Sequence, residues 1–571
     1  MYIERAEAIE NELNLPAVCA SIEDLGVRDP FPFEERSFLA QAVDALKRDN
    51  IDKVRQIRAR HAESVWMGKG ENQAQWQLLQ SAVSLIEACE DGGRQLPDHA
   101  RTQESLIDFY VVSLREVDRW QREFEQAVND YLDVSGGMKD VIQQAQTTYR
   151  RLTSQVQELF IKHLETAGWP PVGRLSNADV FDRLVSPKLQ ESGRRVAFVL
   201  VDALRYELGV ALGKQLAEDG QVETHPAFAQ LPSVTTVGMA SLLPGAGHGL
   251  KLVNRDGEAV PALDEIVLTN VTQRMELLRK RYGERFAETT LLQFTKGKFK
   301  PEHSVELLVL RSTTIDNHLE STPETTLGVV YDTLKRIRMA IHKLAALGFH
   351  EVVIASDHGF FLNTQAEAGD VASKPTGHWV NFHDRCLVGS GAGNASNFVL
   401  PAERLGVRGD FAQVAGPRAL VAYAAGHTYF HGGASLQETV VPVITVRLGA
   451  RPAKEPKQLE VTLSYKRGAK RITTLLPVIE VAVRSADLFS GGAELEFLLE
   501  AHDKKGQVVG EAKAGGPVNP ATRTITLRSG ETAQVTLKME MDFEGKFTVK
   551  ALDPVTLSTY HKLDLETDYT V

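Results

Sequence analysis

The stretch VAFVLVD, residues 196–202, is an unbroken run of apolar residues that ends in an aspartate. Such a run is typical of a strand that is buried on both faces, as in a parallel sheet. The segments Val305–Leu310 and Val352–Ala355 have the same character. Residues 326–347, which lie between these two segments, show a helical pattern long enough for a crossover connection. Strands that alternate with helices predict an α/β domain with a mostly parallel sheet.

The sequence on either side of this domain follows different patterns. Up to about residue 168, apolar residues such as those of the face at 142–159 recur at spacings of three and four, which predicts an all-helical region. That face is expected to pack on neighbouring helices, with a docking surface for a partner protein as the alternative. From about residue 455, short strand-like segments alternate with turn residues, which predicts an antiparallel β-sandwich. These segments are Leu459–Leu463, Val478–Val483, Leu495–Leu499, Thr524–Leu527, Ala533–Met539 and Lys546–Ala551.

The chain is therefore expected to have a helical region with a connector at 1–180, an α/β catalytic domain at 181–455 and a β-sandwich at 456–571. A length of 571 residues suits such a multi-domain organisation. The sequence has no run of 18 or more apolar residues, so we expect no transmembrane helix. The charged start lacks the apolar core of a signal peptide, which predicts a cytoplasmic location.

Charge and cysteine content narrow the chemistry. With a net charge of -11, the chain is expected to bind nucleic acid poorly in a non-specific way, because such binding depends on neutralising phosphates. The three cysteines, Cys19, Cys89 and Cys386, are far apart in the sequence. This excludes a disulfide framework and a Cys-rich zinc cluster. A metal ion in this chain must therefore be held by histidines and carboxylates.

An aspartate follows each of the three apolar runs. Asp202 ends the first run, Asp316 lies a few residues after the second, and Asp357 and His358 follow the third. Singly, these residues could be a helix cap, a loop carboxylate and a hydrogen-bonded pair at a turn. However, the carboxyl ends of parallel strands meet at one edge of a sheet, where ligands bind. Carboxylates and an imidazole at that edge predict a site for a divalent metal ion.

Two further segments carry candidate functional groups. In LPSVTTVGM, residues 231–239, Thr235 and Thr236 precede a predicted helix start, so the hydroxyls are either N-caps or a nucleophile activated by a metal ion. In GHTYFHGGASLQE, residues 426–438, His427 and His431 flank an aromatic pair. The two glycines that follow His431 indicate a close backbone approach. His431 is the better ligand candidate of the two.

Four pieces, taken in order, resemble a known family: VDALRYE at 201–207, LPSVTTVGMASLLPG at 231–245, ASDHGF at 355–360 and HGGASLQETVVPV at 431–443. The set is similar to the PglZ domain of bacterial BREX phage-defence systems, which belongs to the alkaline phosphatase superfamily. The resemblance covers residues of about 190 to 450 and implies an alkaline-phosphatase-like α/β core.

The resemblance implies a role for each residue of the set. Asp202 would bind one metal ion together with Asp357 and His358, and Asp316 and His431 would bind a second. Thr235 would be the nucleophile, because it stands three residues after a proline as in the Pro-x-x-Thr pattern of nucleotide phosphodiesterases, with Thr236 as the fallback. Zinc is the usual metal of the superfamily, and manganese is the alternative.

The sequence departs from the superfamily pattern at one position. Many members have a histidine four residues after the aspartate that corresponds to Asp316, whereas this chain has Glu320 there and His318 two residues earlier. Glu320, His318 and His427 are therefore further metal-ligand candidates, and a depleted second site is the alternative. Arg205 and Arg385 are candidates to bind a substrate phosphate, with Thr236 as a further contact, and the alternative for Arg205 is a solvated surface charge. His383 lies in an irregular stretch from which it could reach the substrate.

The expected function is that of a metal-dependent phosphodiesterase or phosphatase, and a nuclease is one form of this activity. The expected reaction is an in-line attack on phosphorus that forms a phosphothreonine intermediate. Its substrate would be nucleic acid or a nucleotide, and its partners would be other BREX proteins such as the methyltransferase. The main alternative is a catalytically weak scaffold that assembles partner proteins. A sulfatase with a modified cysteine is disfavoured, because the segment at 231–245 contains no cysteine.

Overall fold

The fold is taken from a computed structural model of the chain, which forms two compact units. One unit consists of residues 1–91, 120–150 and 456–571, and the other of residues 92–119 and 151–455. The three-part division expected from the sequence stays a prediction. The structure describes residues 2–20, 22, 25, 29–61, 64–67, 70–131, 138–217, 220–321, 326–363, 371–425, 429–449, 459–485, 494–504, 508–519, 523–540, 543–554 and 559–569.

The centre of the second unit is a six-stranded sheet with the strand order β2-β15-β8-β1-β7-β6. Its members are β1 (Val196–Val201), β2 (Gln221–Phe228), β6 (Phe286–Thr290), β7 (Leu307–Ser312), β8 (Glu351–Ser356) and β15 (Val440–Arg447). The ladders of β1 with β7 and β8, and of β6 with β7, are parallel, whereas β15 runs antiparallel to β8 and β2. The three predicted strands are therefore β1, β7 and β8, with β7 shifted by two residues from its predicted start.

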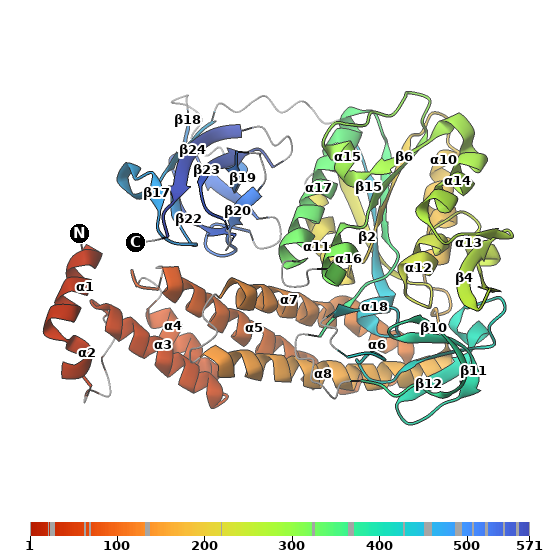
Figure 1. Ribbon diagram of the computed structural model, residues 1–571, viewed down its shortest axis with the longest axis horizontal. Coiled ribbons are helices and arrows are strands. Elements are labelled where there is room, and N and C mark those ends of the chain that lie inside the picture. The colour runs from red at the N-terminus through yellow and green to blue at the C-terminus, as the bar shows by residue number, and fades with distance from the viewer. Residues whose placement is uncertain are drawn as a thin grey trace. The chain divides into compact units, whose positions relative to one another are not determined.

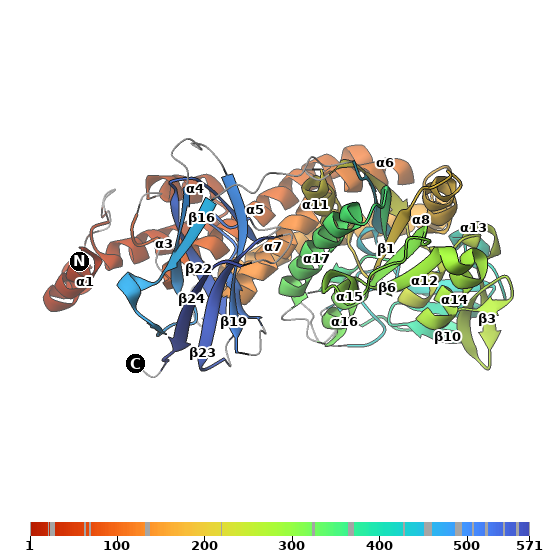
Figure 2. The same ribbon diagram turned by 90° about the horizontal axis from the view of Figure 1, so that it is seen from above.

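Helices cover both faces of this sheet, as Figure 2 shows from above. Alternate residues of β1 point to opposite faces. Val199 belongs to the core shared with one set of helices, α11 (Tyr206–Leu216), α15 (Leu291–Thr295), α16 (Thr314–Ser321) and α17 (Thr326–Ala346). Phe198 belongs to the core on the other face, with α9 (Asn177–Val180), η2 (Phe181–Val185), α12 (Thr235–Ser241) and α14 (Val271–Tyr282). α17 is the predicted crossover helix between β7 and β8.

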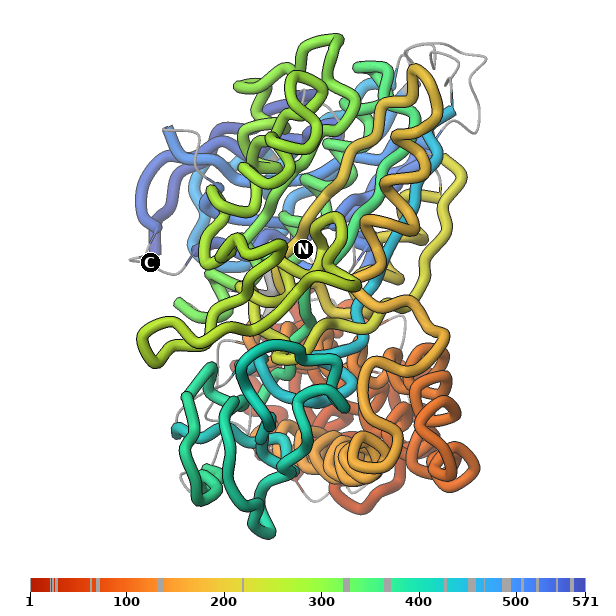
Figure 3. Tube along the Cα trace, turned by 90° about the vertical axis from the view of Figure 1, so that its right-hand side faces the viewer, coloured from red at the N-terminus to blue at the C-terminus, as the bar shows by residue number. Residues whose placement is uncertain are grey.

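Smaller sheets complete the second unit. A four-stranded antiparallel sheet has the order β10-β11-β13-β12 and consists of β10 (Thr376–His383), β11 (Cys386–Ala392), β12 (Asn397–Pro401) and β13 (Gln413–Pro417). Figure 3 shows this sheet in teal beside the C-terminal part of α8 in orange, where Arg418 pairs with Glu165. The sequence pattern missed β10, since its residues were interpreted as irregular. The remaining short elements are β3 (Lys251–Arg255), β4 (Glu258–Leu263), β5 (Ile266–Val267), β9 (Phe361–Leu362), β14 (Tyr429–Phe430), α13 (Ala246–Gly249), η3 (Gly283–Arg285), η5 (Ala402–Leu405) and α18 (Leu436–Thr439).

The described residues before β1 form helices and no strand. These helices are α1 (Tyr2–Leu13), α2 (Leu15–Val18), α3 (Pro32–Lys47), α4 (Ile51–Arg60), α5 (Gly70–His99), α6 (Gln103–Phe109), η1 (Tyr110–Leu114), α7 (Arg115–Asp130), α8 (Met138–Ala167) and, after η2, α10 (Ser186–Leu189). The stretch after Trp169, which the sequence suggested as a connector, contains α9, η2 and α10. Its helices pack on the sheet, because Val180 and Phe181 are fully buried in the core there.

The C-terminal residues of the first unit form a β-domain, drawn in blue in Figure 1. Its strands are β16 (Leu459–Ser464), β17 (Arg471–Ile472), β18 (Val478–Ser485), β19 (Glu494–Asp503), β20 (Val508–Ala512), β21 (Thr524–Arg528), β22 (Thr532–Met539), β23 (Lys546–Leu552) and β24 (Thr559–Thr567), with the short helix η6 (Lys466–Gly468). Hydrogen bonds join eight of these strands in the order β16-β18-β22-β20-β19-β23-β24-β17, and β21 pairs with β19 beside this series. The apolar residues of the strands share one core, and the predicted sandwich stays a prediction.

Candidate functional site

Two buried carboxylates lie side by side at the carboxyl edge of the six-stranded sheet. Asp202 follows β1 and Asp357 follows β8, and these strands pair in parallel with Val201 opposite Ser356. Asp202 is 2% exposed and Asp357 is fully buried. The backbone N–H of Ala203 donates to Asp357 Oδ1 over 3.2 Å, and Ala203 has a positive φ of 58°. The turn after β1 is therefore folded back onto the carboxylate of the neighbouring strand.

Thr235 is the first residue of α12, and its hydroxyl lies next to this pair. Its Oγ1 is 3.3 Å from Asp202 Oδ1 and 3.2 Å from His358 Nε2. The side chain is half-buried. Since Val234 is the N-cap residue of α12, neither threonine serves as the cap that the sequence offered as an alternative. Thr236 follows on the same helix and is also half-buried, but the hydroxyl that contacts the carboxylate and the imidazole is that of Thr235.

His358 completes the first of three candidate ligand groups. Its Nε2 lies 3.5 Å from Asp202 Oδ1 and 3.5 Å from Asp357 Oδ2. Asp202, Asp357 and His358 each offer a ligand atom, and these atoms lie within 4.8 Å of one another. The structure thus brings together the three residues that the sequence assigned to one metal ion.

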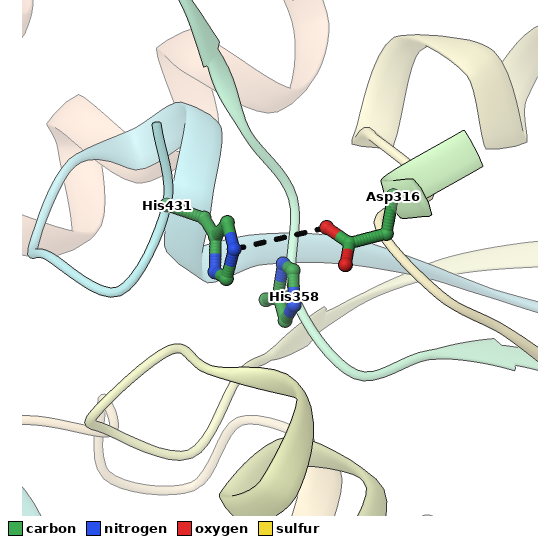
Figure 4. A group of neighbouring side chains, drawn as sticks. All are labelled: Asp316, His358 and His431. Carbon is green, nitrogen blue, oxygen red and sulfur yellow. Dashed lines mark ion pairs between the residues drawn. The ribbon is translucent and has the colours of Figure 1, made fainter. Parts of the chain in front are cut away.

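Asp316, His358 and His431 form a second group, which Figure 4 shows. Asp316 is on α16, and its Oδ1 lies 3.7 Å from His431 Nε2. His431 directly follows β14, and its ring stacks on that of His358. Tyr429, which the sequence noted only as part of an aromatic pair, donates its hydroxyl to Asp316 Oδ1 over 2.6 Å. The same oxygen of Asp316 therefore accepts from a phenol and faces an imidazole.

The third group consists of Glu320, His383 and His431. Glu320 Oε1 lies 4.0 Å from His431 Nε2, and its side chain is 57% exposed. His318, the other candidate on α16, instead has its Nδ1 2.9 Å from the Thr314 carbonyl one turn back and belongs to none of the three groups in the described residues. Of the two alternatives that the sequence left open, Glu320 is the one that the fold brings to the site.

Burial and mutual repulsion set the electrostatics of the site. Burial raises the pKa of Asp202 well above its usual value, and the neighbouring charge of Asp357 adds to the rise. Burial also raises the pKa of Asp357 and lowers that of His358. For His431, burial lowers the pKa, but the neighbouring carboxylates of Glu320 and Asp316 turn the net shift upward. Adjacent buried carboxylates are costly unless a cation compensates them.

Two buried polar atoms of the site have no hydrogen-bond partner within the described residues: Asp357 Oδ2 and His431 Nε2. Such groups are almost always satisfied in native proteins, by protein, water or an ion. A carboxylate oxygen and an imidazole nitrogen are both ligands for zinc and for related divalent ions. The residues present therefore fit divalent metal ions, for which these two unpaired atoms would serve as ligands.

The surroundings of the site include residues that the sequence pattern did not single out. Asn177 of α9 is fully buried and donates through Nδ2 to the carbonyls of Ser356 (2.9 Å) and Asp357 (3.1 Å). Gly238 of α12 packs so closely that a Cβ there would lie 2.7 Å from Asp357 Cβ. The only sequence signals for these roles were the Ser-Asn pair at 176–177, which begins α9, and the glycine inside the predicted helix.

Arg205 and Arg385 do not lie where a substrate phosphate would need them. Both side chains are fully buried. Arg205 lies 3.4 Å from Asp118 Oδ1 and over the ring of Phe360, and Arg385 Nε donates to Glu438 Oε1 over 3.0 Å. This placement argues against the phosphate contact predicted for Arg205, since a buried guanidinium that faces a carboxylate is a structural group. His427 lies outside the described residues.

Comparisons with known proteins concern the domain that contains this site. Residues 180–446 match the family model described as "BREX system PglZ alkaline phosphatase-like domain". The domain that holds the site and the sheet is therefore alkaline phosphatase-like. The match assigns residues 180–446 to the PglZ domain family. The predicted domain at 181–455 closely overlaps this range.

Two curated relatives bear the same family name or a related one. The "Alkaline phosphatase-like protein PglZ" of Bacillus cereus is 23% identical over 440 residues, which cover 71% of this chain and 48% of the relative. The "Alkaline phosphatase-like protein BrxZ" of Escherichia coli is 25% identical over 319 residues, which cover 52% of this chain and 36% of the relative. The chain thus spans about half the length of one curated relative and about a third of the other.

Solved structures with a resemblance include murine ectonucleotide pyrophosphatase/phosphodiesterase 5, at 11% identity and a TM-score of 0.32, covering 44% of this chain and 88% of that chain. Phosphonoacetate hydrolase from Sinorhizobium meliloti, in complex with phosphonoacetate, has 16% identity and a TM-score of 0.29, covering 46% of this chain and 92% of that chain. With TM-scores this low, the two structures support no conclusion about this chain. Among the described residues, no helix is long and apolar enough to cross a membrane.

Proposed function

We propose that this chain is a metal-dependent phosphohydrolase, either a phosphodiesterase or a phosphatase, that acts in a BREX-type phage-defence complex. The observation that carries the proposal is the position of the Thr235 hydroxyl, 3.3 Å from Asp202 Oδ1 and 3.2 Å from His358 Nε2. A hydroxyl is a weak nucleophile by itself and needs an adjacent base or a metal ion. The family match over residues 180–446 supports the same class of reaction.

The proposed reaction consists of two displacements at phosphorus. In the first, Thr235 Oγ1 bonds to phosphorus while the bond to the leaving oxygen breaks, and the hydroxyl proton passes toward Asp202. In the second, water attacks the phosphothreonine, the bond from phosphorus to Oγ1 breaks, and the hydroxyl is restored. Bound divalent cations would supply the Lewis acidity that lowers the pKa of the hydroxyl and steadies the leaving oxygen.

The residues proposed to hold the cations are those of the candidate groups. Asp202, Asp357 and His358 would hold one ion, and Asp316 with His431 would hold the other. Zinc is the first expectation and manganese the alternative, because imidazole and carboxylate donors suit both.

The proposed substrate is a phosphodiester in nucleic acid or in a nucleotide. If the substrate is nucleic acid, the activity is that of a nuclease. The proposed partners are other BREX proteins such as the methyltransferase, in the cytoplasm. The family description and the names of the curated relatives support the assignment to a BREX complex.

One feature favours a second candidate function, a scaffold with little catalytic power. Glu320 stands where the superfamily pattern has a histidine, and its side chain is 57% exposed, so the group of Glu320, His383 and His431 is less enclosed than the other two. A scaffold would keep partner binding when Asp202 and Asp357 are both replaced by asparagine. Loss of phage defence by that double variant, with partner binding kept, would contradict the scaffold and favour the enzyme.

The test of the enzyme is hydrolysis of a chromogenic phosphodiester by the full chain, washed with a chelator and then supplied with Zn²⁺ or Mn²⁺. Thr235→Ala is expected to lose at least about 100-fold in kcat with its metal content kept, because it removes the nucleophile. Thr236→Ala is expected to have a much smaller effect. Thr272→Ala, an exposed threonine on α14, is the control and keeps full activity. Undiminished hydrolysis by Thr235→Ala would overturn the assigned nucleophile.

A further inference from the structure

His383 brings a third element to the edge of the site. It is the last residue of β10 in the small four-stranded sheet, and its ring centroid lies 4.2 Å from that of His431. Glu320, His383 and His431 each offer a ligand atom, and these atoms lie within 4.8 Å of one another. They come from α16, from β10 and from the loop after β14, so only the tertiary fold brings them together.

The hydrogen bonds of the two rings leave the same nitrogen, Nε2, able to bind a metal ion. His383 Nδ1 lies 3.2 Å from the carbonyl of His431, and His431 Nδ1 lies 3.3 Å from the carbonyl of Ser233. A carbonyl only accepts, so each Nδ1 carries the proton and donates, which leaves Nε2 with its lone pair. Histidines that bind metal ions usually donate their other ring N–H to a carbonyl or carboxylate in this way.

A second observation marks the place as a ligand site. The side chain of His431 is 3% exposed, and its buried Nε2 has no hydrogen-bond partner within the described residues. It lies 4.0 Å from Glu320 Oε1 and 3.7 Å from Asp316 Oδ1. Ligands of tetrahedral zinc, with bonds of about 2.0–2.1 Å, lie roughly 3.4 Å apart. The observed separations therefore need only a small contraction to enclose an ion.

The backbone next to His431 leaves room for the His383 ring. Gly432 has a φ of +93°, and a Cβ at this position would lie 2.9 Å from His383 Nδ1 and 3.0 Å from His383 Cβ. Any other residue would push the ring away from His431 and would also be strained in this backbone conformation. The glycine after His431 thus permits the close approach of the two imidazoles.

We infer that His383 is a metal ligand, which together with Glu320 and His431 holds a divalent cation at the open side of the site. The inference rests on the proposed function, since it assigns a further ligand to the same metal-binding site. It also gives the four-stranded sheet a role, because β10 then carries one of the ligands.

The test is equilibrium dialysis of the full chain against Zn²⁺, with bound metal measured by mass spectrometry and the dissociation constant by titration. His383→Ala removes the whole imidazole. His383→Asn keeps a donor near the position of Nδ1 for the His431 carbonyl but lacks Nε2. Both variants are expected to bind one Zn²⁺ fewer per chain, or to bind one at least about tenfold more weakly. His303→Ala, which removes an exposed histidine before β7, is the control and binds as the unaltered chain does.

The outcomes separate the inference from the proposed function. If the unaltered chain binds Zn²⁺ and both His383 variants bind it equally well, His383 is no ligand, while the phosphohydrolase proposal stands. If only His383→Ala loses Zn²⁺, the histidine acts through its hydrogen bond to the His431 carbonyl, and the inference is overturned as well. If the unaltered chain takes up no Zn²⁺, both the inference and the zinc-dependent function fall. Circular dichroism of each variant confirms that the fold is kept.

Discussion

The imidazole of His358 stacks on that of His431, with ring centroids 4.2 Å apart and ring planes 5° apart. His358 follows β8, whereas His431 follows β14, more than 70 residues later in the chain. His358 also belongs to two candidate ligand groups, one with Asp202 and Asp357 and one with Asp316 and His431. The stacked pair therefore joins the two halves of the proposed metal centre.

The first prediction follows from this shared position. His358→Ala is expected to lose more bound metal than Asp202→Asn, because it removes a ligand atom from two groups at once, whereas Asp202 belongs to one. Metal content after dialysis, measured by mass spectrometry, checks this. The control is His318→Ala, since Nδ1 of His318 is turned to the Thr314 carbonyl. Metal loss in the control equal to that in His358→Ala would mean that the two histidines have been assigned wrongly.

The second prediction concerns the asparagine behind the site. Asn177→Ala leaves the buried carbonyls of Ser356 and Asp357 without their donor. At about 1–3 kcal/mol for each unsatisfied buried group, we expect a loss of about 2–6 kcal/mol in the free energy of unfolding and a lower Tm. Asn254→Ala, which removes an exposed hydrogen bond to Gly257, should cost less than about 1 kcal/mol. Equal shifts of Tm in the two variants would contradict the proposed role.

The third prediction uses two glycines inside helices. Alanine favours a helix over glycine by about 1 kcal/mol, so Gly93→Ala on α5 should raise the Tm, since its Cβ would meet only Leu152 Cδ1 at 3.9 Å. Gly238→Ala on α12 should lower both the Tm and kcat, because its Cβ would lie 2.7 Å from Asp357 Cβ and 2.8 Å from the Asp357 carbonyl. Unfolding curves and hydrolysis rates check both. A more stable, fully active Gly238→Ala would show that α12 is not packed against Asp357.

The fourth prediction tests the role of Arg205. Asp118 lies 3.4 Å from the buried guanidinium and accepts a hydrogen bond from Tyr110 over 2.9 Å. Asp118→Ala should lower the free energy of unfolding by about 3–5 kcal/mol, because it takes the carboxylate from a buried cation. The double variant Arg205→Met with Asp118→Leu should recover most of this loss and leave KM unchanged. A large rise in KM for Arg205→Met alone would restore the substrate contact that the sequence suggested.

The local patterns were enough for part of the fold. Runs such as VAFVLV and VVIA are apolar throughout, and β1 and β8 are buried on both faces. β10 was missed because it has no apolar alternation: most of its residues are exposed or half-buried. β2 was missed for the same reason, since its first six residues alternate between exposed and half-buried. Such strands are held by pairing with a neighbour, which no local pattern records.

The sequence by itself determined that these residues would meet: Asp202, Asp316, Asp357 and His358 follow apolar runs, and parallel strands bring their carboxyl ends to one edge. Only the tertiary structure decided which side chains from distant segments of the chain meet. It turned Glu320 and not His318 toward His431, and it placed His383 beside His431. It also buried Arg205 against Asp118. These contacts depend on packing between segments that are distant in the chain, whereas a strand end depends only on its own residues.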